Sequence, residues 1–181
     1  MSEKRYLVTS ALPYANGPLH FGHLAGVYIP ADVYVRHHRM KENRVLHICG
    51  SDEHGVAIML NANKAGKDYK VYVDEWHRSH RELFEAFEIE FDEFGQTSTK
   101  YHEEEVVKWF KAIYDKGLIG TKESEQLKCH DCGNHLPDRF VKGECYECGY
   151  AEARGDECPN CGILIESTRL KNPVCQICGG T

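Results

Sequence analysis

Four Cys-x-x-Cys pairs lie close together near the end of this 181-residue chain, and they constrain its fold more than any other feature. Tetrahedral zinc favours four thiolate ligands, and a Cys-x-x-Cys turn presents two sulfur atoms to one ion. The pairs therefore predict two zinc sites with four cysteines each. The eight cysteines are Cys129, Cys132, Cys145, Cys148, Cys158, Cys161, Cys175 and Cys178.

The spacing of these pairs leaves two groupings open. A sequential grouping would join the first pair with the second and the third with the fourth. A nested grouping would place the two inner pairs in one site and the two outer pairs in the other. A glycine follows the second cysteine of every pair, where a knuckle turn requires a positive φ. These glycines are Gly133, Gly149, Gly162 and Gly179.

Composition excludes several classes of protein. A net charge of −6 argues against a chain coated with Lys and Arg for nucleic-acid binding. No apolar run approaches the ~20 residues that cross a bilayer. No apolar segment follows residues 1–5, so neither a secretory signal nor a disulfide-rich secreted domain is predicted. We therefore expect a cytoplasmic protein with no membrane partner.

Residues 1–120 show alternating strand and helix patterns. Extended runs at 6–9 and 44–49 are each followed by helical periodicity, which predicts an α/β fold with a parallel sheet covered by helices. Helices are expected over 20–40, from 52 or 53 to 66, around 76–87, and around 106–114 with a stop at Gly117. Pro30 is expected to kink the first of them. Cys49 lies in an apolar run and is predicted to be a small buried residue.

The chain changes character near residue 121. From there, cysteine, glycine and short polar turns replace the helical periodicity. Residues 121–181 are therefore predicted to form a separate zinc-knuckle domain that metal, rather than a large apolar core, holds together.

Two segments, residues 11–23 and 50–55, follow the two predicted strands. Ligands of open parallel sheets bind at the carboxyl ends of the strands. His20 and His23 are three residues apart at a helix start, so both rings project from the same side. Such a helix start suits phosphate, and two histidines there can donate hydrogen bonds to a triphosphate. Gly22 between them leaves room for a flat ring, although the His-x-x-His spacing alone is more typical of surface or metal-bound histidines.

Residues 11–23 resemble the "HIGH" signature of the class I aminoacyl-tRNA synthetases, with Phe21 in place of the usual Ile or Leu. Residues 49–55, Cys-Gly-Ser-Asp-Glu-His-Gly, resemble the form found in the methionine-specific branch of that class. Enzymes for branched aliphatic amino acids typically have Trp-Asp-x-His-Gly there. Residues 10–14, 136–140 and the knuckle region match the same branch, so the resemblance covers essentially the whole chain.

The resemblance implies the first half of a Rossmann-like catalytic domain over residues 1–120. An inserted connective-peptide zinc domain would follow over 121–181. The implied reaction joins methionine to ATP, giving methionyl-adenylate and pyrophosphate, and then transfers methionine to the 3′ end of its tRNA. Magnesium is expected with ATP, since it commonly bridges phosphates.

The resemblance also implies roles for individual residues. His20 and His23 would be catalytic, and Asp52 would hold the ammonium group of methionine. His54 would support Asp52 or the substrate pocket. The implied ATP-binding residues are Asn16, Gly17, His20, Gly22 and His23. The implied methionine-binding residues are Ala11, Leu12, Tyr14 and Asp52. Six further histidines match no motif and are interpreted as surface or packing residues, namely His37, His38, His47, His77, His80 and His102.

The resemblance favours the nested grouping of the zinc ligands. The inner site would contain Cys145, Cys148, Cys158 and Cys161. The outer site would contain Cys129, Cys132, Cys175 and Cys178. Closed four-cysteine sites of this kind are structural, and the domain would help to place the tRNA acceptor end.

The class has a second signature, Lys-Met-Ser-Lys-Ser, which this sequence does not contain. We therefore expect the chain to be the amino-terminal part of a longer enzyme and to be inactive, or nearly so, by itself. One alternative is another class I synthetase or a HIGH-type nucleotidyltransferase. A second alternative, from a different class, is a zinc-ribbon binding module whose α/β half is a scaffold without ATP contacts at His20 or His23.

Overall fold

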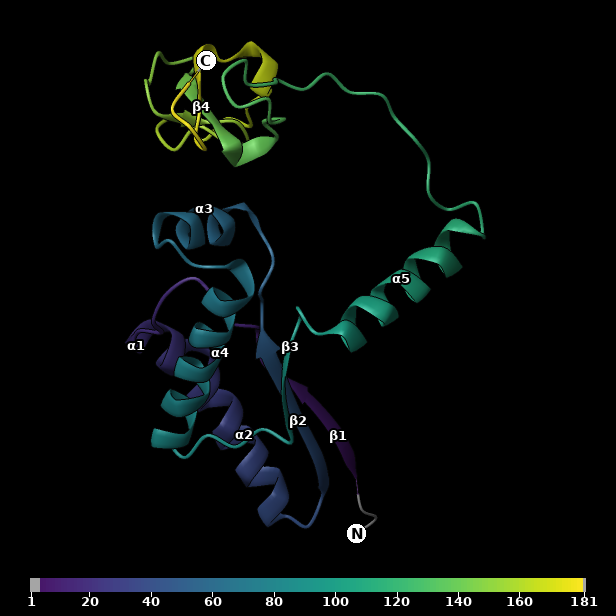
Figure 1. The fold of residues 1–181 in the computed structure, drawn as a ribbon. Coiled ribbons are helices and arrows are strands. Elements are labelled where there is room, and N and C mark those ends of the chain that lie inside the picture. Colours follow the sequence, from purple (N-terminus) through teal and green to yellow (C-terminus); the bar gives the residue numbers. More distant parts are fainter. Residues whose placement is uncertain (1–3, 181) are drawn as a thin grey trace. The chain divides into compact units, whose positions relative to one another are not determined.

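The computed structural model describes residues 4–180, and the chain forms two compact units, Met1–Lys116 and Gly117–Thr181 (Figure 1). The division therefore lies slightly before the expected boundary at residues 120 and 121. It falls at Gly117, whose φ of 68° takes the chain out of the preceding helix α5 (Lys100–Tyr114). This is the helix stop that the sequence predicts.

A three-stranded parallel sheet in the order β1-β2-β3 forms the centre of the first unit. Its strands are β1 (Arg5–Thr9), β2 (Arg44–Ser51) and β3 (Glu93–Gln96). The register places Thr9 beside Ile48 and Ser51 beside Gln96, so the strands end at one edge. The expected α/β fold is confirmed. The sequence patterns did not predict β3, which is four residues long and contains Gly95.

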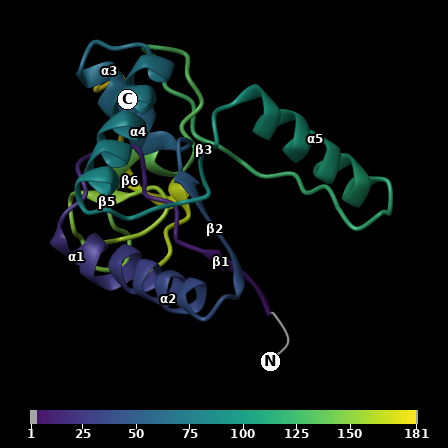
Figure 2. The same ribbon diagram turned by 90° about the horizontal axis from the view of Figure 1, so that it is seen from below.

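Helices α2 (Ile29–Met40) and α4 (Tyr69–Ala86) lie on the same side of this sheet (Figures 1 and 2). Aromatic side chains build much of the core between them, with Tyr28 and Phe84 in edge-to-face contact at 4.7 Å. On the strands, Leu7 and Leu46 are 64% and 50% exposed. The described residues therefore cover one face of the sheet and leave apolar side chains on the other.

The helix expected over residues 20–40 forms as three consecutive segments, α1 (Phe21–His23), the π-helical turn η1 (Leu24–Tyr28) and α2. In the π turn, the Ile29 N–H bonds to the Leu24 carbonyl. Pro30 follows in the first turn of α2, where its missing N–H costs least. The sequence predicts a kink at Pro30, and the structure has a π turn directly before this residue.

The prediction that a helix begins at Asp52 or Glu53 is wrong. Helix α3 (Val56–Lys64) begins later, with Gly55 as its N-cap at a φ of 137°. Asp52 is held in extended conformation instead, because it forms a β-bridge with Tyr14. Cys49 is partly buried beside the aromatic core, in partial agreement with the predicted buried residue.

None of the residues of α5 is buried, although its apolar side chains have helical spacing. Seven of its large apolar and aromatic side chains are at least 41% exposed in this chain, namely Tyr101, Val106, Val107, Trp109, Phe110, Ile113 and Tyr114. Within residues 4–180, no helix combines the length and apolar character needed to span a membrane.

The second unit is built on a small antiparallel sheet in the order β5-β4-β6. Its elements are η2 (Asp138–Phe140), β4 (Val141–Glu144), β5 (Ala153–Arg154), η3 (Ser167–Arg169) and β6 (Lys171–Cys175). Four of the nine buried residues in its core are cysteines. The glycines after the four cysteine pairs have φ values of 70°, 73°, 73° and 77°, as predicted.

Candidate functional site

The segments that follow β1 and β2 lie side by side at the carboxyl edge of the sheet. The Asp52 N–H donates to the Pro13 carbonyl, and the Ala15 N–H donates to the Asp52 carbonyl, both over 2.8 Å. This bridge sets Tyr14 opposite Asp52. Leu12 and Tyr14 are 48% and 38% exposed, so they can contact a ligand. Three of the four residues predicted for methionine binding are thus neighbours.

Ala11, the fourth predicted methionine-binding residue, is exposed and begins the same segment. Its carbonyl accepts a hydrogen bond from the Tyr28 hydroxyl at 3.0 Å. Burial raises the pKa of Tyr28 well above its ordinary value, so this hydroxyl remains a donor. The contact fixes the segment to the helical face below it.

His20 and His23 form a reciprocal cap at the start of the helix. The Nδ1 atom of His20 accepts from the Gly22 N–H, and the Nδ1 atom of His23 accepts from the His20 N–H, each over 3.1 Å. The rings stack with centroids 3.8 Å apart. Because both Nδ1 atoms are acceptors, hydrogen-bond logic assigns the ring protons to Nε2. Each histidine therefore keeps an N–H donor.

Gly22 is required by this arrangement. A Cβ atom on Gly22 would lie 2.9 Å from Cε1 of His20. The sequence predicts room for a flat ring at Gly22. In this structure the imidazole of His20 lies there.

The turn before the helix is fastened to two other helices. Oδ1 of Asn16 accepts from Nδ2 of Asn61 at 3.0 Å and from the Tyr72 hydroxyl at 3.3 Å. The Gly17 carbonyl bonds to Nε2 of His80 at 2.9 Å. The Asn16 side chain, which was predicted to bind ATP, thus uses its oxygen to anchor the turn. His80 is buried, and its position is that of a support rather than of a surface residue.

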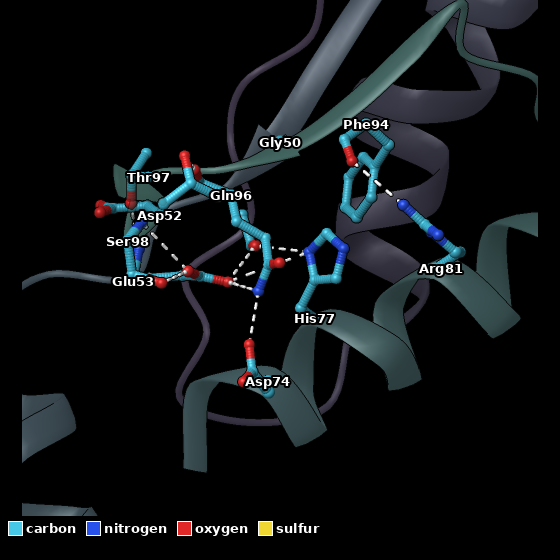
Figure 3. Close-up of polar contacts among 12 residues, drawn as sticks. Gly50, Asp52, Glu53, Asp74, His77, Arg81, Phe94, Gln96, Thr97 and Ser98 are labelled. Atoms are coloured by element: carbon cyan, nitrogen blue, oxygen red, sulfur yellow. Dashed lines mark hydrogen bonds and ion pairs between the residues drawn. The ribbon is translucent and has the colours of Figure 1, made fainter. Parts of the chain in front are cut away.

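A buried carboxylate lies directly beside Asp52 (Figure 3). The Glu53 side chain is 0% exposed. Its Oε1 atom accepts from the Ser51 hydroxyl at 2.7 Å and from Nε2 of Gln96 at 3.0 Å. Its Oε2 atom accepts from the N–H of Ser98 at 3.2 Å and also from the Ser98 hydroxyl. The ends of β2 and β3 are thereby joined through one side chain.

His54 and Gly55 complete this edge. Nε2 of His54 bonds to the Thr97 carbonyl at 3.1 Å, and its Nδ1 atom lies 3.2 Å from the Tyr69 hydroxyl. A Cβ atom on Gly55 would lie only 2.4 Å from the hydroxyl of Tyr14. The close approach of Tyr14 to the backbone therefore requires glycine at this position.

The eight cysteine sulfurs gather in two groups of four in the second unit. One contains Cys129, Cys132, Cys175 and Cys178, and the other contains Cys145, Cys148, Cys158 and Cys161. Across the pairs the Sγ–Sγ distances are 3.5, 3.8, 3.9 and 3.6 Å. A tetrahedral ion with Zn–S bonds of about 2.3 Å separates its sulfurs by about 3.8 Å. The donor set and its spacing therefore fit a four-thiolate metal site.

Polar groups around the sulfurs favour the thiolate form that a metal needs. Backbone and side-chain hydrogen bonds from Asn134 lower the pKa of Cys132 to about 6. Hydrogen bonds from the Asn160 side chain and the Tyr150 backbone lower the pKa of Cys148 to about 6. The Ile177 N–H also donates to Sγ of Cys175 at 3.3 Å. Burial and the neighbouring cysteines raise the pKa of Cys161 and Cys178 to about 12, so one cysteine of each cluster readily forms a thiolate and another resists it in the absence of a cation.

Sequence reasoning missed the supporting residues of the first site. The motifs give Glu53 no role. His77 and His80 are predicted to be surface or packing residues, and both are buried, but the prediction names no polar partner for either. A signal was present, because His77 and His80 interrupt the apolar face of a helix at a spacing of three. Buried histidines on such a face need polar partners, which here are Ser51 and Gly17.

Known proteins are similar to this chain over almost its whole length. The family described as "tRNA synthetases class I (M)" matches residues 6–181. The chain is 48% identical to a methionine–tRNA ligase of Rubrobacter xylanophilus and 47% identical to one of Chlamydia trachomatis, each over 99% of this chain. It spans 32% of the length of these relatives.

Solved structures of aminoacyl-tRNA synthetases are also similar to this chain. Two are methionyl-tRNA synthetase of Mycobacterium tuberculosis with methionyl-adenylate. One is 28% identical with a TM-score of 0.59, covering 64% of this chain and 22% of that one. The other is 25% identical with a TM-score of 0.66, covering 83% of this chain and 30% of that one. A leucyl enzyme of Agrobacterium radiobacter, 22% identical with a TM-score of 0.66 over 85% of this chain and 20% of that one, shares the fold.

Proposed function

The chain belongs to the class I (M) tRNA synthetases, and we propose that it supplies the first half of a site that activates methionine with ATP. The proposal rests on the β-bridge between Tyr14 and Asp52 at the carboxyl edge of the sheet. The chain continues from Tyr14 to the helix start that His20 and His23 cap. One edge thereby offers an anion for an ammonium group, apolar surface for a side chain, and N–H donors for phosphate.

In this proposal, Asp52 pairs with the ammonium group of methionine. Its Oδ1 atom accepts from the His54 N–H at 3.3 Å, which orients the carboxylate. Leu12 and Tyr14 contact the side chain, since a flexible thioether is well matched by apolar and aromatic surfaces. Ala11 begins the same wall.

His20 and His23 donate their Nε2–H groups to the phosphates of ATP. The methionine carboxylate oxygen attacks the α-phosphorus, the bond to the bridging oxygen breaks, and pyrophosphate leaves. Negative charge grows on the phosphate oxygens during this displacement, and donors fixed in advance by the Nδ1 bonds stabilise it without reorganisation. Asn16, Gly17 and Gly22 shape the backbone against which the nucleotide lies. Mg²⁺ would neutralise charge on the phosphates.

The second step passes the methionyl group to the 3′ end of the tRNA. We propose that the second unit binds two Zn²⁺ ions in the nested grouping, as a structural element that helps to place the acceptor end. A reducing compartment such as the cytoplasm suits eight thiolate ligands.

The test is amino-acid-dependent ATP–pyrophosphate exchange by the full-length protein. Methionine should support exchange and the other amino acids should not. His20→Asn and His23→Asn should each lower kcat by roughly 100-fold, because each removes a donor of the transition state. Exchange that depends on another amino acid would favour a different synthetase. Absence of exchange, with tRNA or protein binding by the second unit, would favour the zinc-ribbon module.

A further inference from the structure

The buried carboxylate of Glu53 is not used by the proposed chemistry, although it directly follows Asp52. A buried charge is costly unless hydrogen bonds or a partner charge compensate it. The hydrogen bonds from Ser51, Gln96 and Ser98 give it four donors within the described residues. A carboxylate so fully bonded is rigid, and it fixes whatever it is attached to.

Further contacts tie this carboxylate to helix α4 (Figure 3). The Ser51 hydroxyl lies 2.8 Å from Nδ1 of His77, and Nε2 of Gln96 also donates to Oδ1 of Asp74 at 2.7 Å. Because the Ser51 hydroxyl donates its proton to Glu53, it must accept from Nδ1–H of His77. Burial lowers the pKa of His77, whose Nδ1 lies 3.9 Å from Glu53, so hydrogen bonds rather than an ion pair hold the charge at neutral pH.

The main chain at the same place carries this rigidity to Asp52. The Glu53 N–H donates to Oγ1 of Thr97 at 2.9 Å, and the Glu53 carbonyl accepts from the Tyr69 hydroxyl. On the other side, Asp52 is bonded to Pro13 and Ala15. Asp52 therefore lies between two fixed points.

We infer that Glu53 is a positioning residue, which holds the Asp52 carboxylate at the place where the ammonium group of the amino acid binds. This inference rests on the proposed function. It deepens that function, because the affinity for the ammonium group would depend on a second, fully buried residue that does not touch the substrate.

The principal variant is Glu53→Gln in the full-length protein. The change keeps the volume of the side chain, but its new NH₂ group meets a donor of Gln96 or Ser98 whichever way it is placed. We expect the KM for methionine in ATP–pyrophosphate exchange to rise roughly tenfold, since a displaced Asp52 loses part of its charge interaction. The KM for ATP should stay within about twofold of wild type.

Two competitive inhibitors separate positioning of Asp52 from a general disturbance of the pocket. Methioninol keeps the ammonium group of methionine, and 4-(methylthio)butanoic acid lacks it. In Glu53→Gln the inhibition constant of methioninol should rise roughly tenfold, whereas that of 4-(methylthio)butanoic acid should change less than about twofold. Equal rises for both compounds would overturn the inference.

A matched control is Asp32→Asn, which also removes a largely buried carboxylate of the first unit, one that pairs with Arg36 on α2. It should reduce the active fraction without changing the KM for methionine. If Glu53→Gln does not fold, Ser98→Ala removes one donor and should raise the methioninol constant about threefold.

The outcomes distinguish the two proposals. Methionine-dependent exchange by the wild type, with no split between the inhibitors in Glu53→Gln or Ser98→Ala, would overturn the role of Glu53 alone. Failure of the wild type to use methionine would overturn the proposed function and the inference together.

Discussion

At the scale of single residues, Asp52 is the charge on which methionine binding should depend. Asp52→Asn keeps the shape and the β-bridge to Tyr14 but removes the anion. We expect the KM for methionine to rise by roughly thirty-fold or more, equivalent to about 2 kcal/mol of a desolvated charge pair. Steady-state exchange measured at saturating ATP checks this. Asp68→Asn, at the exposed N-cap of α4, should leave this KM unchanged; an equal rise there would contradict the assignment.

Gly55 provides a second prediction at this scale, one that concerns backbone geometry. Its φ of 137° is rarely open to other residues, and a Cβ atom would meet the Tyr14 hydroxyl. Gly55→Ala should lower the free energy of unfolding of the first unit by about 1–3 kcal/mol and raise the KM for methionine by moving Tyr14. Denaturant titration followed by tryptophan fluorescence measures the stability, since Trp76 and Trp109 both lie in the first unit.

Gly66→Ala is the matched control for Gly55→Ala. Gly66 also has a positive φ, 64°, but open space where its Cβ would lie. It should cost about 1 kcal/mol in backbone strain without changing substrate binding. If both variants raised the KM equally, contact with Tyr14 would not be the cause.

At the scale of elements, local patterns predicted most of the first unit. The alternating strand and helix signals gave β1, β2 and the helices, because burial of an apolar face leaves a clear periodicity. The short strand β3 left none: it contains Gly95, pairs with Gly50 and is stabilised by neighbours distant in sequence. The start of α3 was misplaced for the same reason, because the bridge that holds Asp52 extended joins it to Tyr14.

The candidate site divides in the same way. Tyr14, Asp52 and the two histidines could be placed in the proposed site from motifs. Glu53 could not, because its proposed role depends on Gln96 and Ser98 reaching it from another strand end. The grouping of cysteines is also non-local. One cluster joins the pair that precedes η2 to the pair at the end of β6, and the other joins the pair that follows β4 to the pair that precedes η3. Spacing along the chain could therefore not decide the grouping.

Double substitutions in the second unit would distinguish the two groupings by metal content alone. In the nested grouping, Cys145→Ser with Cys158→Ser damages one site, and one equivalent of zinc should remain per chain. Cys129→Ser with Cys145→Ser damages both, and bound zinc should approach zero. The sequential grouping predicts the reverse result for the two variants. Elemental analysis after gel filtration measures the ratio, and the reversed pattern would overturn the nested sites.

Buried histidines make the first unit sensitive to acid. Burial lowers the pKa values of His47, His77 and His80, and each ring is hydrogen-bonded in its neutral form. Below about pH 6.5 the unfolded chain binds protons that the folded unit resists, so stability is complete above that pH and is lost as the pH falls. Each histidine contributes up to about 1.4 kcal/mol per pH unit.

The pH dependence can be checked by tryptophan-detected unfolding between pH 7.5 and about 5. His77→Gln should flatten the profile, because one proton-linked group is removed. His102→Gln, which changes an exposed residue of α5, should not alter the slope. A slope unchanged by His77→Gln would show that this histidine does not carry the linkage.

At the scale of the whole molecule, two features of the chain suit a larger catalytic domain. The chain has exposed apolar surfaces, and it contains one of the two sequence signatures of the class. Its apolar α5 side chains and the open face of the sheet are exposed, and its relatives are about three times as long, since the chain spans 32% of them. The Lys-Met-Ser-Lys-Ser sequence is absent from the chain. The hydrogen-bond donors of this chain would therefore contact a triphosphate from one side, without the donors that the second signature is expected to supply from the other side.

We expect the isolated 181-residue chain to show no methionine-dependent ATP–pyrophosphate exchange above background, while the full-length protein is active under the same conditions. Catalysis by positioning and charge stabilisation fails steeply when half of the contacts are missing, because the contacts act as a unit. Two equivalents of bound zinc and a cooperative tryptophan transition in the isolated chain would establish that it is folded in this assay. Robust exchange by such a chain would show that residues 1–181 hold a complete site, and the division of the active site proposed here would then be wrong.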